Sequence, residues 1–199
     1  MAGVEQVSAT GDPLIDGLLM GTRWDGPLTY AFPTSADAYG YGPERNGFGP
    51  LNGSATQAGT KIWAATRAYD EVRSFTLLDL SPAAPGAVAD LRLAETTTPG
   101  GGRQPGWTAY GNFPDTTEAA GDAWFNTSDY DTPYLGTFAY QTFLHEIGHT
   151  LGLKHGHLPG FGNPSLPGEW DSQEFTVMTY RAYVGQDSDG YGIPAGNYP

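Results

Sequence analysis

The sequence contains no cysteine among its 199 residues, and this absence removes several kinds of site. Without thiols the chain has no disulfide framework, no thiolate zinc cluster and no cysteine nucleophile. Any metal ion that the protein binds must therefore be held by histidine, aspartate, glutamate or tyrosine side chains.

Basic residues and long apolar runs are also scarce. Nine Lys and Arg stand against 22 Asp and Glu, so the formal net charge is -13 at pH 7. A surface of this sign does not attract nucleic acid or anionic lipid, and we expect neither as a partner. No apolar run reaches the roughly 18 residues of a membrane span. Residues 1–8 lack the features of a secretory signal peptide, so the protein stays inside the cell or its export signal lies elsewhere.

Glycine and proline are abundant, with 29 and 16 residues, at a level that can accompany disorder. Aromatic residues make up 13% of the chain, however, which is too many for a chain with nothing to bury. The length suits one domain with a sizeable core. We therefore expect a folded domain that is rich in ordered loops.

The apolar pattern predicts an α+β domain. Apolar residues recur at helical spacing over residues 54–72, with Asn52 or Ser54 as the cap, and over residues 137–151. Short strands are predicted at residues 29–32, 75–80, 90–94, 107–113 and 122–125. After Gly152 the chain is predicted to be irregular to its end. Strands and one helix thus precede a second long helix and a loop-rich tail.

The second helix carries a pattern that predicts a metal site. At about 100° per residue, His149 lies about 40° from His145 around the helix and Glu146 about 100° from it, while the opposite face is apolar. Two imidazoles one turn apart can bind the same Zn²⁺ at about 2.0–2.1 Å. Gly152 can adopt the left-handed conformation that ends a helix, and the reversed chain could return His155 as a third ligand.

This pattern has a definite chemical use. Three neutral imidazoles leave one zinc position open for water, whose pKa the metal lowers to about 7. Glu146 is placed to take the proton of that water and to pass it to a leaving amine. The plain alternative is a pair of surface histidines on an ordinary amphipathic helix. A chance His-Glu-x-x-His is expected only about 0.003 times in this composition, so we favour the metal site.

The extended motif, which runs from His145 through His149 and Gly152 to His155, resembles the signature of the serralysins, a family of metzincin metalloproteases. The segment Phe175 to Tyr180 resembles the Met-turn of that family. The resemblance implies that Met178 forms an apolar floor under the metal. It also implies that Tyr180 is a further, switchable metal ligand and a catalytic phenol that stabilises the oxyanion.

The resemblance also implies a fold and a substrate-binding strand. The fold would be zincin-like or metzincin-like, with a twisted, mixed five-stranded sheet and two long helices. Residues 1–152 would form an upper subdomain, and residues 153–199 an irregular lower subdomain with the Met-turn. Residues 107–113 would be an edge strand that holds an extended peptide by backbone hydrogen bonds. The residues expected to contact the substrate are Thr108, Ala109, Tyr110, Gly111 and Asn112.

Two further motifs carry no assigned role. His157 is the fourth histidine, matches no ligand position and is interpreted as a loop residue. The sequence Asp187-Ser188-Asp189-Gly190 is similar to part of a calcium loop but lacks the later acidic residue of an EF-hand. A solvated turn is the preferred interpretation, and no repeat in the chain supports Ca²⁺ binding.

The resemblance implies a zinc-dependent metalloendopeptidase that hydrolyses extended protein or peptide substrates, with one catalytic Zn²⁺ and Glu146 as general base. We expect a monomer that is secreted to the extracellular space by a route independent of a signal peptide. No part of this sequence matches the C-terminal β-roll or the last helix of the family. We therefore expect a C-terminal segment or β-roll domain as a further partner of these residues. The alternative is a non-catalytic, zinc-organised module of a larger secreted or surface protein. A hydrolase or deaminase that reuses the zinc motif is a third hypothesis, but the Met-turn has no place in it.

Overall fold

The computed structural model describes residues 2–99, 108–160 and 162–186. A mixed sheet with strand order β5-β3-β6-β8-β7 occupies its centre. Its strands are β3 (Leu28–Ala31), β5 (Leu80–Pro82), β6 (Leu91–Thr96), β7 (Ala109–Gly111) and β8 (Asp122–Asn126). Four of them run parallel, and β7 pairs antiparallel with β8 at the edge. A two-residue strand, β4 (Phe48–Gly49), pairs with β6, so the mixed sheet has six strands, whereas five were predicted.

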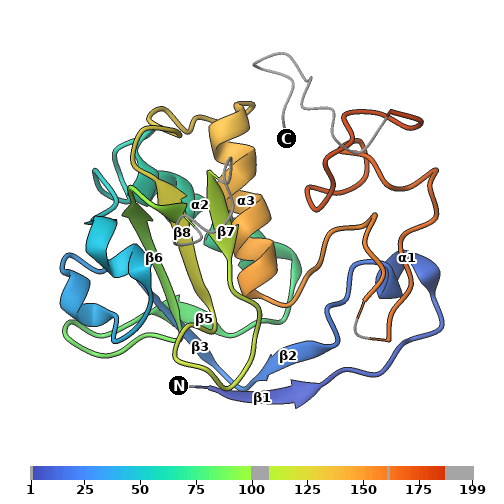
Figure 1. Ribbon diagram of the computed structural model, residues 1–199, viewed down its shortest axis with the longest axis horizontal. Coiled ribbons are helices and arrows are strands. Elements are labelled where there is room, and N and C mark those ends of the chain that lie inside the picture. The colour runs from blue at the N-terminus through green and yellow to red at the C-terminus, as the bar shows by residue number, and fades with distance from the viewer. Residues whose placement is uncertain (1, 100–107, 161, 187–199) are drawn as a thin grey trace.

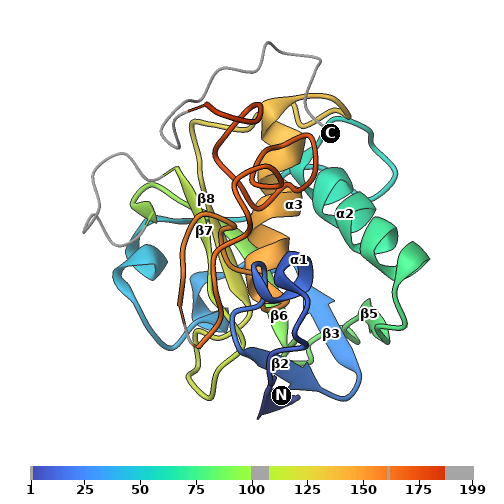
Figure 2. The same cartoon turned by 90° about the vertical axis from the view of Figure 1, so that its right-hand side faces the viewer.

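The two long helices, α2 (Lys61–Phe75) and α3 (Phe138–Thr150), lie side by side on one face of the sheet (Figures 1 and 2). The main core forms between them and the strands, and Ala65, Leu93 and Phe143 are fully buried there. The opposite face of the sheet buries Tyr39, Ala94 and Trp124. Side chains of β6 and β8 therefore alternate between two cores, as the period of a strand requires.

The first long helix begins later than predicted. It starts at Lys61, and the Thr60 hydroxyl accepts a hydrogen bond from the Trp63 N–H as the N-cap. Gly59 explains the difference, because its φ of 79° is left-handed and cannot continue a helix from residue 54. Asn52 still contributes, since its side chain accepts from the Lys61 N–H at 3.0 Å. Ser54 does not cap the helix.

The strand predicted at residues 75–80 is wrong for most of its length. Helix α2 continues to Phe75, and Leu77 is fully exposed. The strand β5 begins only at Leu80, which is the first residue that pairs with β3. The predicted strands at residues 29–32, 90–94 and 122–125 all correspond to observed strands, because each has a paired neighbour in the sheet.

The N-terminal segment links the sheet to the irregular C-terminal segment. Strands β1 (Gly3–Gln6) and β2 (Thr22–Asp25) form a separate antiparallel pair, with the short helix α1 (Pro13–Asp16) between them in the sequence. Figure 1 shows α1 beside the irregular segment that follows α3. Within residues 153–160 and 162–186, the structure has no helix or strand.

The described residues therefore form a mixed α/β fold with one main sheet and three α-helices. No helix among these residues combines the length and apolar character needed to cross a bilayer.

Candidate active site

The chain reverses direction directly after the C-terminal end of helix α3. The Thr137 hydroxyl caps its start by accepting from the Tyr140 N–H. At its end, the Gly152 N–H donates to the His149 carbonyl at 3.0 Å, and the Leu153 N–H donates to the Gly148 carbonyl at 2.9 Å. Gly152 has φ 103°, so the pair of bonds is a Schellman ending with glycine in the left-handed position. The reversal brings His155 beside α3.

Three histidine side chains meet beside this helix. The Nε2 atom of His155 lies 3.0 Å from the Nε2 atoms of both His145 and His149. Imidazoles that bind one Zn²⁺ at about 2.0–2.1 Å in tetrahedral geometry have their nitrogen atoms about 3.3 Å apart. The three nitrogen atoms are therefore spaced as ligands of a single small cation.

The second nitrogen of each helix histidine fixes its tautomer. The Nδ1 of His145 lies 2.6 Å from the Val177 carbonyl, and the Nδ1 of His149 lies 2.7 Å from the Leu153 carbonyl. A carbonyl only accepts hydrogen bonds, so both Nδ1 atoms carry the proton and both Nε2 atoms present lone pairs. These lone pairs face the same Nε2 of His155, which has at most one proton to offer. The cluster thus fits a bound metal ion better than a hydrogen-bonded trio.

Burial keeps the three imidazoles neutral. It lowers the pKa of His145 to about 4, that of His149 to about 3 and that of His155 to about 2, and the neighbouring imidazoles add to the effect on His149 and His155. A metal binds only the neutral imidazole. The histidines are therefore in the ligating form at neutral pH.

Glu146 lies on the same helix and is almost fully buried. Burial raises its pKa to about 8, and a hydrogen bond from the Gly111 backbone opposes the rise. Its Oε2 atom has no hydrogen-bond partner among the described residues. A buried carboxyl group with an unused oxygen beside a histidine cluster is suited to proton transfer.

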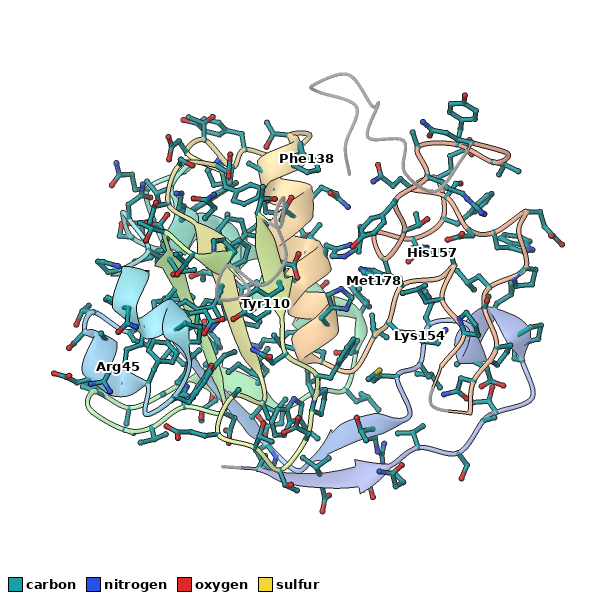
Figure 3. All side chains as sticks on the ribbon, viewed as in Figure 1. Arg45, Tyr110, Phe138, Lys154, His157 and Met178 are labelled. Carbon is teal, nitrogen blue, oxygen red and sulfur yellow. The ribbon has the colours of Figure 1, made fainter. Side chains whose placement is uncertain are left out.

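The segment predicted as a Met-turn packs against α3. Met178 is fully buried, and its Sδ atom fills the space beside Gly148, where a Cβ atom would lie 2.5 Å from the sulfur. In Figure 3, Met178 lies between α3 and the irregular segment. The Met178 carbonyl also accepts from the Gly156 N–H at 3.0 Å. The turn thus supports both the helix and the chain next to His155.

Tyr180 lies beside the histidine cluster. Its ring centroid is 4.5 Å from that of His155 and 5.8 Å from that of His145. The ring of His157 stacks on His155 at 5.4 Å and lies 5.3 Å from Tyr180. His157 is located in the irregular segment and is not part of the three-histidine cluster. The motif at Asp187 to Gly190 lies outside the described residues.

The predicted substrate strand is the edge strand β7. The Thr108 carbonyl accepts from the Asn126 N–H, and the Asn112 N–H donates to the Asp122 carbonyl. Because hydrogen-bonded pairs alternate in an antiparallel ladder, the polar backbone groups of Ala109 and Gly111 point away from β8. Among the described strands, β7 has no other neighbour. Residues 100–107, including Trp107 of the predicted strand, lie outside the described part of the chain.

A cleft of about 1050 Å³ joins these elements. Its lining includes β7, the three histidines, Glu146 and Tyr180, so the structure brings all these predicted residues together, with Met178 buried beneath them. The cleft is also lined by residues that were not predicted as site residues, among them Tyr130, Phe138, Gln141 and Thr142. Phe138, Gln141 and Thr142 lie seven, four and three residues before His145, so helical periodicity could have indicated them. Tyr130 had no such signal, and it adopts φ 60°, with its hydroxyl hydrogen-bonded to that of Thr108.

Comparison with known proteins finds relatives that are named as serralysins and metallopeptidases. It is 33% identical to Serralysin G of Dickeya chrysanthemi over 181 residues, a match that covers 84% of this chain and 36% of the relative. It is 28% identical to Metallopeptidase AprA of Pseudomonas marginalis over 172 residues, which covers 83% of this chain and 32% of that protein. A shorter match, 40% over 87 residues, covers 36% of this chain and 17% of a Serralysin of Proteus mirabilis.

No family model matches the chain. The first two relatives nevertheless match most of its length, and the chain spans about a third of the length of each of them. These matches confirm the resemblance that the motif predicted. The chain is therefore a homologue of the serralysin-type metalloproteases and corresponds to about a third of their length.

Proposed function

We propose that this chain is a zinc-dependent metalloendopeptidase that cleaves extended protein or peptide substrates. The observation that carries the proposal is the meeting of three neutral imidazole Nε2 atoms beside a buried carboxyl group in one cleft. The alternative of a non-catalytic zinc module explains the imidazoles. It gives no reason for Glu146, because a structural zinc site needs no general base.

His145, His149 and His155 would hold the metal, and Tyr180 would be an additional ligand in the absence of substrate. An all-nitrogen set from three imidazoles suits Zn²⁺ and excludes the oxygen-rich coordination that Ca²⁺ and Mg²⁺ prefer. When bound, Zn²⁺ would polarise the scissile carbonyl and make a water molecule more acidic.

Glu146 would act as general base. It accepts the proton of the attacking water and then donates that proton to the leaving amine. Its unused Oε2 atom is available for this transfer, and the Gly111 backbone hydrogen bond holds the carboxyl group toward β7. A cation in the cluster would favour the ionised form of Glu146, because opposite charges lower a carboxyl pKa.

Tyr180 and Met178 would support the reaction in different ways. The Tyr180 phenol would donate to the oxyanion that forms during attack. Met178 would keep α3 and the histidine cluster in place from below, as its packing against Gly148 indicates. His145 would be held in its ligating orientation by the Val177 carbonyl of the same turn.

The edge strand β7 would bind the substrate backbone. The polar backbone groups of Ala109 point away from β8, and an extended peptide could pair with them as an added strand. Such pairing uses backbone groups that every peptide has, so it suits broad sequence tolerance. Thr108, Tyr110 and Asn112 would contribute through the walls of the cleft.

The same homology supports proposals about the whole protein. We assign a metzincin-like fold in which residues 1–152 form an upper subdomain and residues 153–199 a lower one with the Met-turn. We also propose a monomeric enzyme that acts outside the cell after export independent of a signal peptide. We further propose that a C-terminal segment such as a β-roll domain accompanies this chain in the whole protein.

The test compares the purified chain with its Glu146→Gln variant in a casein and peptide digestion assay, with zinc content measured in parallel. We expect the variant to lose about 10²–10⁴-fold in kcat/KM while it keeps one zinc ion. Glu169→Gln, at an exposed position, is the matched control and should keep full activity. Chelation should abolish cleavage and zinc should restore it. If the zinc-loaded protein cleaves no substrate, the proposed peptidase function is wrong and the non-catalytic zinc module is favoured.

A further inference from the structure

Lys154 is a buried lysine directly before His155. Only 4% of its surface is exposed, although lysine is among the residues that are rarely buried. Its Nζ atom donates to the carbonyl of Gly17 at 2.6 Å and to those of Leu158 and Pro164 at 2.8 Å each. An ammonium group has three N–H donors, so the three main-chain carbonyls use all of them.

The three carbonyls come from separate parts of the chain. Gly17 directly follows α1, whereas Leu158 and Pro164 flank a tight turn. That turn is closed by two backbone hydrogen bonds between Gly160 and Asn163. Figure 3 shows Lys154 in the space between α1 and the irregular segment. A single charged atom thus joins the N-terminal segment to both sides of the turn.

The turn that Lys154 holds is part of the cleft. Leu158, Pro159 and Gly160 line the cleft together with the histidines, and Lys154 itself reaches its surface. Among the described residues of the turn, one other hydrogen bond reaches a distant segment, from the Asn163 side chain to the Leu19 carbonyl at 3.0 Å. The ammonium group thus contacts both sides of the turn that forms this wall.

His155, in contrast, is held by backbone hydrogen bonds that do not involve the lysine side chain. The Gly156 N–H donates to the Met178 carbonyl, and the Gly156 carbonyl accepts from the Leu166 N–H at 2.8 Å. The Lys154 N–H donates to the Leu18 carbonyl at 2.8 Å. Loss of the ammonium group should therefore move the wall more than the histidine.

We propose that the carbonyls of Gly17, Leu158 and Pro164 form a cation-binding cage whose occupant is the tethered Lys154 ammonium group, and that this cation positions the cleft wall at residues 158–160 for substrate binding. Lys154 is thus a positioning residue. Its ammonium group occupies the cage in place of a free cation and holds the three carbonyls together. The substrate effect rests on the proposed peptidase function, whereas the cage does not.

Two variants test the cage without reference to activity. Lys154→Ala removes the atoms of one n-propylammonium ion and leaves a space open to the cleft, whereas Lys154→Met fills that space with an uncharged chain. We expect both to lower the thermal midpoint by about 5–10 °C, because two or three buried hydrogen bonds are lost. Added n-propylammonium chloride should restore at least half of the loss in Lys154→Ala and nothing in Lys154→Met.

The controls separate the charge from the shape. Sodium chloride and n-propanol at the same concentration should restore much less of the thermal midpoint of Lys154→Ala. Neither compound combines a propyl group with three N–H donors. If Lys154→Ala folds only in the presence of n-propylammonium, the cage is supported. If no amine raises its thermal midpoint above the effect of sodium chloride, the cage is wrong.

The positioning role is tested on Lys154→Met with a peptide substrate and a zinc titration. We expect KM to rise about tenfold while kcat stays within about twofold, the pattern of lost substrate binding. The zinc stoichiometry should stay at one. A lower thermal midpoint with unchanged KM would show that Lys154 stabilises the fold only. If the unmodified chain cleaves no peptide, the proposed function fails, and the amine experiment still decides the cage.

Discussion

Gly111→Ala should disturb the contact between the edge strand and the metal-site helix. A Cβ atom at Gly111 would lie 2.4 Å from the carbonyl oxygen of Glu146 and 3.0 Å from the Cβ of His149. Ordinary contacts to a Cβ atom begin near 3.4 Å. Both neighbouring atoms belong to the frame of α3 and cannot rotate away. The strand and the helix must therefore separate by about 1 Å, a distance estimated from these contacts.

The size of the effect follows from that displacement. Overpacking of this kind costs about 1–3 kcal/mol of stability. At about 2–4 °C per kcal/mol for a chain of this size, the thermal midpoint should fall by about 2–12 °C. A displacement of about 1 Å at a catalytic site can cost about 10²-fold in rate. We therefore expect kcat/KM for peptide hydrolysis to fall by about 10–100-fold, since Gly111 contacts both the proposed general base and a proposed ligand.

The assay compares thermal unfolding and peptide hydrolysis for Gly111→Ala and Gly168→Ala. A Cβ atom at Gly168 would have no neighbour within 4 Å, so this variant is the matched control and should keep both values. An unchanged thermal midpoint for Gly111→Ala, with kcat/KM within twofold of the unmodified value, would refute this prediction. In that case the approach of β7 to α3 would not position the site.

Three further outcomes are expected. Zinc added to chelated protein at about 1000 times its Kd should stabilise the fold by about 4 kcal/mol. In differential scanning fluorimetry the thermal midpoint should then rise by about 8–16 °C, and His149→Ala should lack this shift. Arg92→Met should lower the free energy of unfolding by about 3–5 kcal/mol in urea titrations, because it leaves Asp122 buried without its bidentate partner. Arg45→Met, which removes an exposed ion pair, is the control and should change that energy by less than about 1 kcal/mol. Trp24→Phe should cost about 1 kcal/mol by the same measurement, since it removes the hydrogen bond from its indole N–H to the last carbonyl of α3; an unchanged value would show that this bond adds nothing.

The accuracy of the sequence-based prediction differs between the two long helices for a physical reason. Helix α3 was predicted within one residue at each end, because Thr137 is a good cap and Gly152 a good terminator. For α2 the apolar spacing continued into residues 54–60, and nothing in that spacing shows that Gly59 is left-handed. Gly59 also leaves room for a remote ring, since a Cβ atom there would lie 2.2 Å from Tyr134. A contact with a remote residue leaves no periodic trace.

Strands show the same dependence on partners. The apolar residues at 75–80 alternate or cluster as in a strand, yet a strand forms only from Leu80, where pairing with β3 begins. A strand needs hydrogen bonds from a neighbour, whereas a helix makes its own. The place of Tyr130 in the cleft depends on a distant partner in the same way, because its hydroxyl bonds to that of Thr108, 22 positions away in the sequence.

By itself, the sequence determined the chemistry of this protein's candidate site. The spacing of His145, Glu146 and His149 places their side chains on one face of a helix, and this follows from the helical period alone. Only the tertiary structure decided what surrounds them: the Val177 carbonyl that orients His145, the edge strand at Gly111 and the carbonyl cage of Lys154. The contact of His145 with Val177 joins residues 32 positions apart, and that of Lys154 with Gly17 joins residues 137 positions apart. Local spacing reports one element at a time, whereas such contacts depend on how elements pack against one another.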